Sequence, residues 1–144
     1  MRIERLMQDK GHEVVTIGPE ASVADAARLL SERRIGAVLI VDEAGRPAGI
    51  LSERDIVREL GRRGPACLDN PVKDMMTATL QSCRAADTLD EVLARMTEGR
   101  FRHMPVVDAE GVMTGVISIG DVVKARLGEL AHERDALEGM VMGY

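Results

Sequence analysis

Two segments of this sequence combine residue types that can hold a charged ligand. Gly49–Asp55 and Gly115–Asp121 both follow the pattern Gly-h-h-Ser-x-x-Asp, in which h is an apolar residue. The glycine lets a backbone or a ligand approach closely, and the serine lies where a strand is expected to lead into a helix. Unsatisfied amides at a helix N-terminus attract anions, and an aspartate one turn later can accept two hydrogen bonds from a vicinal diol such as a ribose. Together these groups suit a nucleoside phosphate.

The same spacing also has a purely structural explanation. Ser-x-x-Asp is a capping box, in which the serine and the acid satisfy only the amides of their own helix. The chain has similar boxes at Ser22/Asp25 and Thr88/Glu91, where no glycine-led strand precedes them. The joint repetition of glycine, serine and aspartate favours a ligand, but the residues alone leave both explanations open.

The two segments belong to an internal repeat. When the chain is shifted by 66 residues, Ser22–Arg58 aligns with Thr88–Lys124 without a gap, and nine of the 37 pairs are identical. A repeat of this kind indicates one supersecondary unit per copy, and a unit of about 50 residues buries too little surface to be stable alone. We therefore expect the two units to pack sheet to sheet around a pseudo-twofold axis.

Apolar periodicity predicts the order β-α-β-β-α in each copy. In the first copy we expect strands at 14–17, 35–41 and 48–51 and helices at 22–30 and 52–60, after a short N-terminal helix at 3–9. In the second copy we expect strands at 80–83, 104–107 and 113–117 and helices at 88–98 and from 118 onward. The predicted fold class is α+β, with repeat 1 and the N-terminal helix over 1–60, a linker over 61–77, repeat 2 over 78–126 and a helical tail over 127–144.

The two copies differ in their cations. Arg102 and His103 enter a strand of the second copy, where a basic pair could meet a phosphate, and a solvated arginine beside a packed histidine is the alternative. The first copy has Arg54 in its motif, and the second has Gly120 at the same position. If both sites bind anions, they use different cations.

Composition narrows the classes of function. A net charge of −5, a pI near 5.2, one Phe, one Tyr and no Trp argue against nucleic-acid binding. No apolar run approaches the roughly 20 residues of a membrane span and no signal-peptide pattern is present, so we expect a soluble, cytoplasmic protein. Cys67 and Cys83 form no CxxC pair, and His12, His103 and His132 lack metal-ligand spacing. We expect neither a metal site nor catalysis, since no catalytic motif is present.

As a set, the motifs resemble a known family. The resemblance lies in six segments: Val14–Pro19, Ile35–Asp42, Gly49–Val57, Val72–Thr77, Arg102–Asp108 and Gly115–Val123. From residue 14 to about 126 the chain is similar to a tandem pair of cystathionine-β-synthase (CBS) domains, called a Bateman module. Its nearest likeness is to small stand-alone bacterial proteins that consist of such a pair.

The resemblance implies a regulatory module, without a catalytic cofactor, that binds an adenine nucleotide (AMP, ADP, ATP, NAD(H) or S-adenosylmethionine) in the clefts between the repeats. In this family the serine or threonine of the motif contacts the phosphate, the aspartate binds the ribose, and the first and central strands hold the base. The corresponding first-site residues are Thr16, Ile17, Gly36, Ala37, Val38, Ser52, Arg54 and Asp55. The second-site residues are Cys83, Arg102, His103, Met104, Pro105, Ser118 and Asp121. Arg102 or His103 can also reach a phosphate in the first site, and Lys73 and Thr77 are further candidates.

The family likeness also implies a homodimer. After Asp121 the chain carries an apolar stripe at helical spacing, formed by Val123, Leu127, Leu130, Leu137 and Val141. This stripe can meet a second subunit, a partner helix or its own module. The alternative function is a structural adaptor that dimerises and binds a protein partner without nucleotide. The sequence names neither the nucleotide nor the regulated partner, and unequal affinity of the two sites is expected from their different motif residues.

Overall fold

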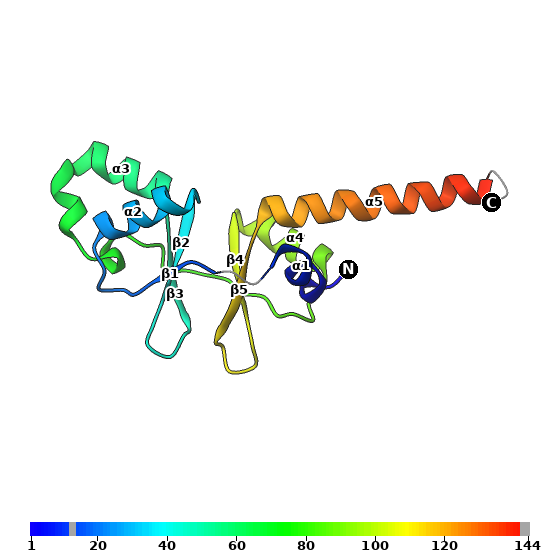
Figure 1. Ribbon diagram of the computed structural model, residues 1–144, viewed down its shortest axis with the longest axis horizontal. Coiled ribbons are helices and arrows are strands. Elements are labelled where there is room, and N and C mark those ends of the chain that lie inside the picture. The colour runs from blue at the N-terminus through cyan, green and yellow to red at the C-terminus, as the bar shows by residue number, and fades with distance from the viewer. Residues whose placement is uncertain (12–13, 142–144) are drawn as a thin grey trace. The chain divides into compact units, whose positions relative to one another are not determined.

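The chain folds into two units, each built on one copy of the repeat. The computed structural model describes residues 1–11 and 14–141 (Figure 1). The first-repeat unit comprises Val14–Gln81 and Ala109–Met113, and the second-repeat unit comprises Met1–Glu13, Ser82–Asp108 and Thr114–Tyr144. Both units combine helices with a small sheet, which confirms the predicted α+β class.

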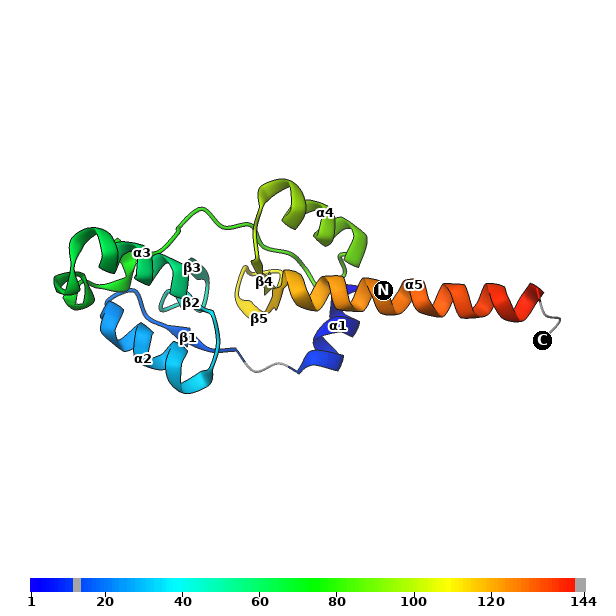
Figure 2. The same ribbon diagram turned by 90° about the horizontal axis from the view of Figure 1, so that it is seen from above.

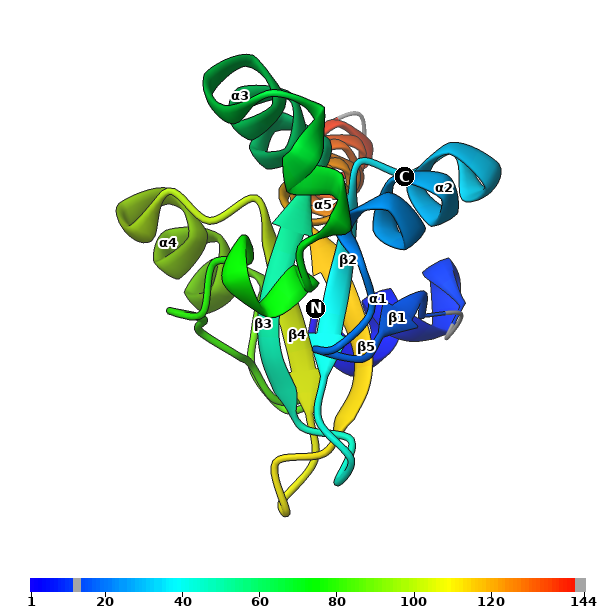
Figure 3. The same cartoon turned by 90° about the vertical axis from the view of Figure 1, so that its left-hand side faces the viewer.

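The first-repeat unit contains a three-stranded sheet. Its elements are β1 (Thr16–Ile17), α2 (Val23–Arg33), β2 (Ala37–Val41), β3 (Pro47–Ser52) and α3 (Glu53–Arg63). Strand β2 lies between β1, to which it is parallel, and β3, to which it is antiparallel (Figure 3). Two short 3₁₀ helices, η1 (Pro65–Asp69) and η2 (Val72–Asp74), occupy the predicted linker. The buried core joins the helices to the sheet through Val23, Ala26, Leu30, Val38, Ile40, Leu51, Ile56 and Val72.

The second-repeat unit pairs a hairpin with three helices. Its elements are α1 (Ile3–Lys10), α4 (Leu89–Gly99), β4 (His103–Val107), β5 (Met113–Ser118) and α5 (Ile119–Val141). Helix α5 lies between α1 and α4 and contacts both (Figure 2). The predicted tail is not a separate element, because α5 runs without a break from the motif to Val141.

One predicted strand is reduced to a single bridge. Instead of a strand at 80–83, Cys83 alone pairs, in parallel, with Val106. The chain turns directly afterwards, since the amide of Arg84 donates to the Asp87 carboxylate at 2.9 Å and the amide of Asp87 donates back to the Arg84 carbonyl at 3.0 Å. This turn ends the pairing after one residue.

Local signals place the first helix of each copy. Ser22 Oγ accepts the amide of Asp25 at 3.0 Å, and Thr88 forms a reciprocal capping box with Glu91. At the other end, Arg34 and Arg100 adopt left-handed backbone conformations, with φ of 55° and 58°. The two helices therefore begin and end at equivalent positions of the repeat.

The N-terminal helix packs against the second copy, although the predicted boundaries placed it with repeat 1. The amide of Ile3 donates to the Asp87 carbonyl at 2.9 Å, and that of Leu89 donates to the Met1 carbonyl at 3.0 Å. Ile3, Leu6 and Met7 belong to the buried core of the second-repeat unit. Since these apolar side chains follow a helical period wherever they pack, the pattern alone could not assign them to one copy.

The linker makes the matching contacts in the first-repeat unit. The amide of Val72 donates to the Ala21 carbonyl at 2.7 Å, and that of Val23 donates to the Asn70 carbonyl at 2.9 Å. These bonds repeat the pattern found around Ile3 and Leu89. Each copy is thus completed by the segment that precedes the other copy in the sequence.

Candidate functional site

The first Gly-h-h-Ser-x-x-Asp motif forms a strand-to-helix junction. Ser52 ends β3 and is the N-cap of α3. The amide and hydroxyl of Ser52 donate to Asp55 Oδ2 at 3.0 and 2.9 Å, and the amide of Asp55 donates to Ser52 Oγ at 3.2 Å. The structural explanation of the motif therefore holds at this junction, and any ligand must share the two side chains with their own helix.

One oxygen of the first-motif carboxylate points to an exposed cation. Arg58 donates to Asp55 Oδ1 at 2.8 Å, and the Arg58 side chain is 66% exposed. Such an ion pair is held weakly, because water screens it and the arginine loses entropy to form it. Arg54 is exposed beside it and forms no ion pair with any residue that the structure describes.

Most predicted first-site residues gather around this junction. The amide of Glu53 donates to the Gly36 carbonyl at 2.9 Å, and Ala37 lies opposite Ser52 in the β2–β3 register. Val38 is fully buried, so neither its side chain nor its backbone is exposed to a ligand. Thr16 and Ile17 lie on the neighbouring strand β1, beside Leu39 and Ile40.

The two linker candidates occupy different places. Thr77 extends the sheet by pairing with Ile50 through two backbone hydrogen bonds of 2.9 and 3.0 Å. Lys73 forms an ion pair of 2.7 Å with Glu20, beyond the carboxyl end of β1, and this hydrogen bond and charge raise the pKa of the lysine. Because Ser52 faces the amino end of β2, the first-repeat unit does not bring Lys73 to the junction.

The second motif repeats the junction. The amide of Ser118 donates to Asp121 Oδ2 at 3.0 Å, and the amide of Asp121 donates to Ser118 Oγ at 3.1 Å. The amide of Ile119 donates to the Arg102 carbonyl at 2.8 Å, as that of Glu53 does to Gly36 in the first copy. The repeat therefore preserves the backbone geometry as well as the residue types.

The second-motif carboxylate forms an ion pair with a lysine that was not among the predicted site residues. Lys10, the last residue of α1, donates to Asp121 Oδ2 at 2.6 Å and to the Val116 carbonyl at 2.8 Å. Burial raises the pKa of Asp121, but the hydrogen bonds from Lys10 and Ser118 outweigh it and hold the pKa below its ordinary value. No local pattern could reveal this contact, since it depends on α1 packing with the second copy.

The two basic residues of the second copy differ in their exposure to solvent. Arg102 is exposed, whereas His103 is half-buried at the start of β4. Burial lowers the pKa of His103, and the positive charges of Lys10 and Arg102 lower it further against the opposing effect of Asp121. His103 is therefore favoured in its neutral form at neutral pH.

The other predicted second-site residues, Cys83, Met104 and Pro105, are buried. Met104 and Cys83 belong to the buried core. The amide of Cys83 donates to the Pro105 carbonyl at 2.9 Å. Burial, together with the charge of Asp87, raises the pKa of the Cys83 thiol to about 12, so this thiol stays protonated and is a poor nucleophile.

The motif glycines are contacted by methionines. A Cβ placed on Gly115 would overlap the end of the Met7 side chain, and one placed on Gly49 would overlap Met76 and lie 3.1 Å from the Thr77 carbonyl. From the sequence we expected a backbone or a ligand to approach these glycines closely. Within each unit it is a methionine, from the segment preceding the other copy, that makes the close approach.

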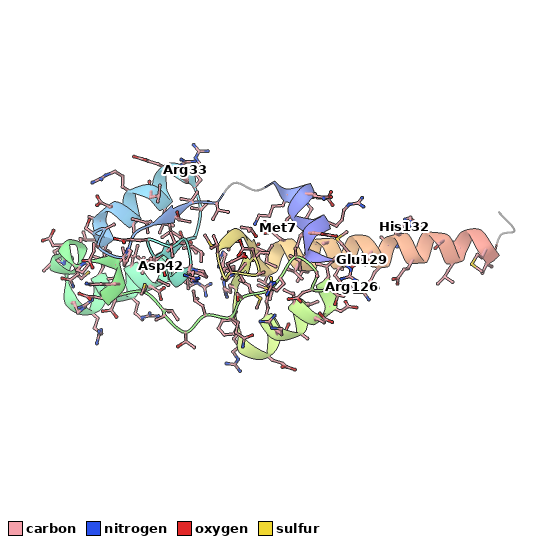
Figure 4. The ribbon with its side chains drawn as sticks, turned by 90° about the horizontal axis from the view of Figure 1, so that it is seen from below. Met7, Arg33, Asp42, Arg126, Glu129 and His132 are labelled. Atoms are coloured by element: carbon pink, nitrogen blue, oxygen red, sulfur yellow. The ribbon has the colours of Figure 1, made fainter. Side chains whose placement is uncertain are left out.

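A groove between α1 and α5 adjoins the second motif. It encloses about 820 Å³, and its lining includes Lys10, Asp121, Glu129 and His132. Arg126, Glu129 and His132 follow one another along α5 (Figure 4). The groove thus presents charges of both signs next to the second-motif carboxylate.

Metal and membrane features are absent from the part of the chain that the structure describes. Residues 1–11 and 14–141 contain no group of three or more His, Cys, Asp or Glu side chains placed to hold a metal ion. No helix within those ranges is long and apolar enough to cross a membrane. His12, whose spacing in the sequence argued against a role as a metal ligand, lies outside the described residues.

The sequence matches a protein-family model. The model is that of the CBS domain, and it matches twice, over residues 3–62 and 72–128. Both junctions lie within the matched ranges. The first match also includes α1, although α1 packs against the second copy.

Solved structures and curated proteins of the same kind are similar over most of the chain. A CBS-domain containing protein from Agrobacterium tumefaciens is 43% identical, with a TM-score of 0.80, over 88% of this chain and 99% of that one. The CBS domain protein PAE2072 from Pyrobaculum aerophilum, complexed with AMP, is 27% identical, with a TM-score of 0.78, over 92% and 99% of the two chains. An uncharacterized 17.7 kDa protein from Acidianus ambivalens is 30% identical over 80% of this chain and 68% of its own length. Of the next two curated relatives the chain spans 61% and 57%.

Proposed function

The chain belongs to the CBS domain family, and from this premise we propose that it is a regulatory module that binds an adenine nucleotide. The ligand would be AMP, ADP, ATP, NAD(H) or a related adenosine compound. No catalytic step is part of this proposal. The protein would act in the cytoplasm by binding its ligand in one conformation more tightly than in another, so that the difference in affinity sets the size of the response.

The observation that carries the proposal is the doubled junction. In both units a serine hydroxyl, the first amides of a helix and an aspartate meet at one point. The amides and the positive end of the helix dipole suit a phosphate, and the carboxylate suits a ribose. The complex of the Pyrobaculum aerophilum relative with AMP supports this choice of ligand.

The two sites are expected to differ in strength. At the first junction, Asp55 faces Arg58, which is exposed and easily displaced, and Arg54 is available for a phosphate. At the second junction, Asp121 is bound by Lys10, whose side chain is 28% exposed. A ribose would have to replace a shorter ion pair with a less exposed cation there, so we propose that the first site binds the nucleotide more tightly.

Isothermal titration calorimetry with AMP, ADP, ATP, NADH and S-adenosylmethionine tests the proposal. We expect saturable binding of at least one of them. We expect Asp55→Asn to weaken it roughly tenfold to a hundredfold, because a hydrogen bond to a charged group is worth about 1.5–3 kcal/mol. Asp25→Asn is the matched control, since Asp25 holds the equivalent capping position on α2 without a glycine-led strand before it. The proposal is wrong if none of the five compounds binds, or if both substitutions weaken binding equally.

A structural adaptor is the second candidate, favoured by the exposed apolar stripe on α5. In that case the chain binds a protein partner without nucleotide. Asp55→Asn and Asp121→Asn would then leave partner binding unchanged, and no adenine nucleotide would raise the melting temperature.

A further inference from the structure

Lys10 occupies the position where a ligand of the second junction would have to bind. Its ammonium group donates to Asp121 Oδ2 at 2.6 Å, and the amide of Ser118 donates to the same oxygen at 3.0 Å. The ammonium group and the amino end of α5 are therefore close neighbours at one carboxylate oxygen. A nucleotide with its ribose on Asp121 and its phosphate on the first amides of α5 would meet Lys10 through both groups.

The lysine loses its counter-ion when a ribose takes its place on the carboxylate. Its side chain is 28% exposed, and besides Asp121 it donates to the Val116 carbonyl at 2.8 Å. A hydroxyl group that displaced the ammonium from Asp121 would leave it beside that carbonyl without an opposite charge. Leaving a partly buried charge unpaired is unfavourable, so a ligand that carries no charge would bind weakly at this junction.

The first junction does not impose this penalty. The cation on Asp55 is Arg58, which belongs to the same helix and is well exposed. Water can solvate this guanidinium group once a ribose displaces it, so little is lost. The aligned residue of the second copy is Lys124, which forms no ion pair with any residue in 1–11 and 14–141. At the second junction, a cation from α1 has thus replaced the one that the repeat itself supplies.

A phosphate would give the displaced lysine a new counter-ion. The first amides of α5 suit a phosphate, and a phosphate bound there lies next to the ammonium group of Lys10. The motif supplies no cation of its own at this point, since Gly120 aligns with Arg54 of the first copy. Hydrogen bonds between an ammonium group and a phosphate are strengthened by charge. Lys10 would therefore exchange one anion for another and remain paired.

We propose that Lys10 is a specificity-determining residue, through which the second junction selects phosphorylated adenine nucleotides over adenosine compounds that lack a phosphate. The first junction selects less strictly, because its cations are exposed to water. This inference rests on the proposed function and names the ligand class of one of its two sites.

An NMR titration followed at the His103 imidazole measures occupancy of the second junction separately from the first. The charges of Lys10 and Asp121 both act on His103, so its signals should shift when a ligand displaces the lysine. The full chain carrying Asp55→Asn is titrated with AMP and with adenosine, because this substitution weakens the first junction. The ratio of the two affinities measures the selection for a phosphate.

We expect Lys10→Met to lower this ratio roughly tenfold to a hundredfold, the range that a hydrogen bond to a charged group supplies. The change should come mainly from tighter binding of adenosine, since Lys10 is paired both before and after AMP binds. Arg5→Met is the matched control and should leave the ratio unchanged. It removes an exposed cation from the same helix, whose pair with Asp9 is 3.6 Å long.

The outcomes separate this inference from the proposed function. Equal effects of Lys10→Met and Arg5→Met on the ratio would overturn the inference alone, because AMP would still bind. Calorimetric binding of AMP to the unsubstituted chain that leaves the His103 signals unmoved would also overturn it alone, since only the first junction would then be occupied. If neither compound binds the unsubstituted chain, the proposed function fails and this inference fails with it.

Discussion

At the scale of single residues, the two copies use one motif in different electrostatic settings. Asp55 is paired within its own helix by Arg58, whereas Asp121 is paired by Lys10 from a helix more than a hundred residues away in the sequence. The serine–aspartate capping bonds are the same in both. The difference between the copies therefore arises from the neighbours of the motif and not from the motif itself.

The Lys10–Asp121 pair gives a prediction about stability and pH. Because the folded-state pKa of Asp121 is held below its ordinary value, the pair stabilises the fold above pH ~4 and loses its effect as pH falls through the folded pKa. We expect Lys10→Met to lower the free energy of unfolding by about 1 kcal/mol at neutral pH. The deficit should shrink below pH ~4, where Asp121 becomes protonated.

Urea unfolding between pH 2.5 and pH 7 measures this effect. Arg5→Met is the control, since Arg5 and its partner Asp9 are both well exposed and their pair is 3.6 Å long. We expect the control to change stability by a few tenths of a kcal/mol at most. A deficit for Lys10→Met that stays constant down to pH 2.5 would show that Asp121 is not its origin.

At the scale of secondary-structure elements, local signals begin and end the helices. Ser22, Ser52, Thr88 and Ser118 accept hydrogen bonds from amides in the first turn that follows them. All four starts were predicted from the sequence because capping bonds connect residues three apart. The first strand of the second copy was not predicted correctly, since its pairing depends on the turn at Arg84–Asp87.

The left-handed residues at the ends of α2 and α4 give a second prediction. Arg34 has a φ of 55°, which costs an L-residue about 1–2 kcal/mol relative to ordinary helical backbone. Glycine adopts this conformation without a Cβ clash, so we expect Arg34→Gly to raise the free energy of unfolding by about 0.5–1 kcal/mol. Glu32→Gly, within α2, should lower it by about 1 kcal/mol. Chemical denaturation compares the two, and a loss of stability in both would contradict the expectation.

The motif glycines give a third prediction. Gly49→Ala should destabilise the protein by about 1–3 kcal/mol, because the new Cβ would overlap Met76 and approach the Thr77 carbonyl, which belongs to the backbone and cannot swing aside. Gly120→Ala is the control, because the nearest atom to its Cβ would be Ser118 Oγ at 3.7 Å and alanine favours the helix. Equal effects of the two substitutions on the melting temperature would contradict this explanation of the glycine.

At the scale of the whole molecule, the segment that precedes each copy in the sequence packs against the other copy. Helix α1 completes the core of the second-repeat unit, and the linker completes that of the first-repeat unit. The backbone bonds that attach Ile3 and Val72 are equivalent in the two units. Each unit therefore depends on residues that the sequence places next to the other.

The exchange predicts where a mutation in α1 will act. Ile3 is fully buried, so Ile3→Ala should cost about 2–5 kcal/mol. Hydrogen exchange should accelerate in α4 and β4 while α2 and β2 stay protected, if the two units open separately. Glu4→Ala, at an exposed neighbouring position, should change stability by less than about 0.5 kcal/mol. Accelerated exchange confined to α2 and β2 would contradict the assignment of α1 to the second-repeat unit.

The sequence by itself determined the α+β class, the two copies and the capped junctions, because strand alternation, helix caps and repeats depend on residues close together in the chain. It also named the residues of the candidate sites, whose binding roles remain predictions. Only the tertiary structure decided which copy each preceding segment completes, that Lys10 holds Asp121, and that Met7 and Met76 cover the motif glycines. These contacts join residues far apart in the chain, and an apolar period or a single lysine has the same local appearance whichever partner it meets. The exposure of the α5 stripe was likewise decided by packing, since the same spacing could have served a core.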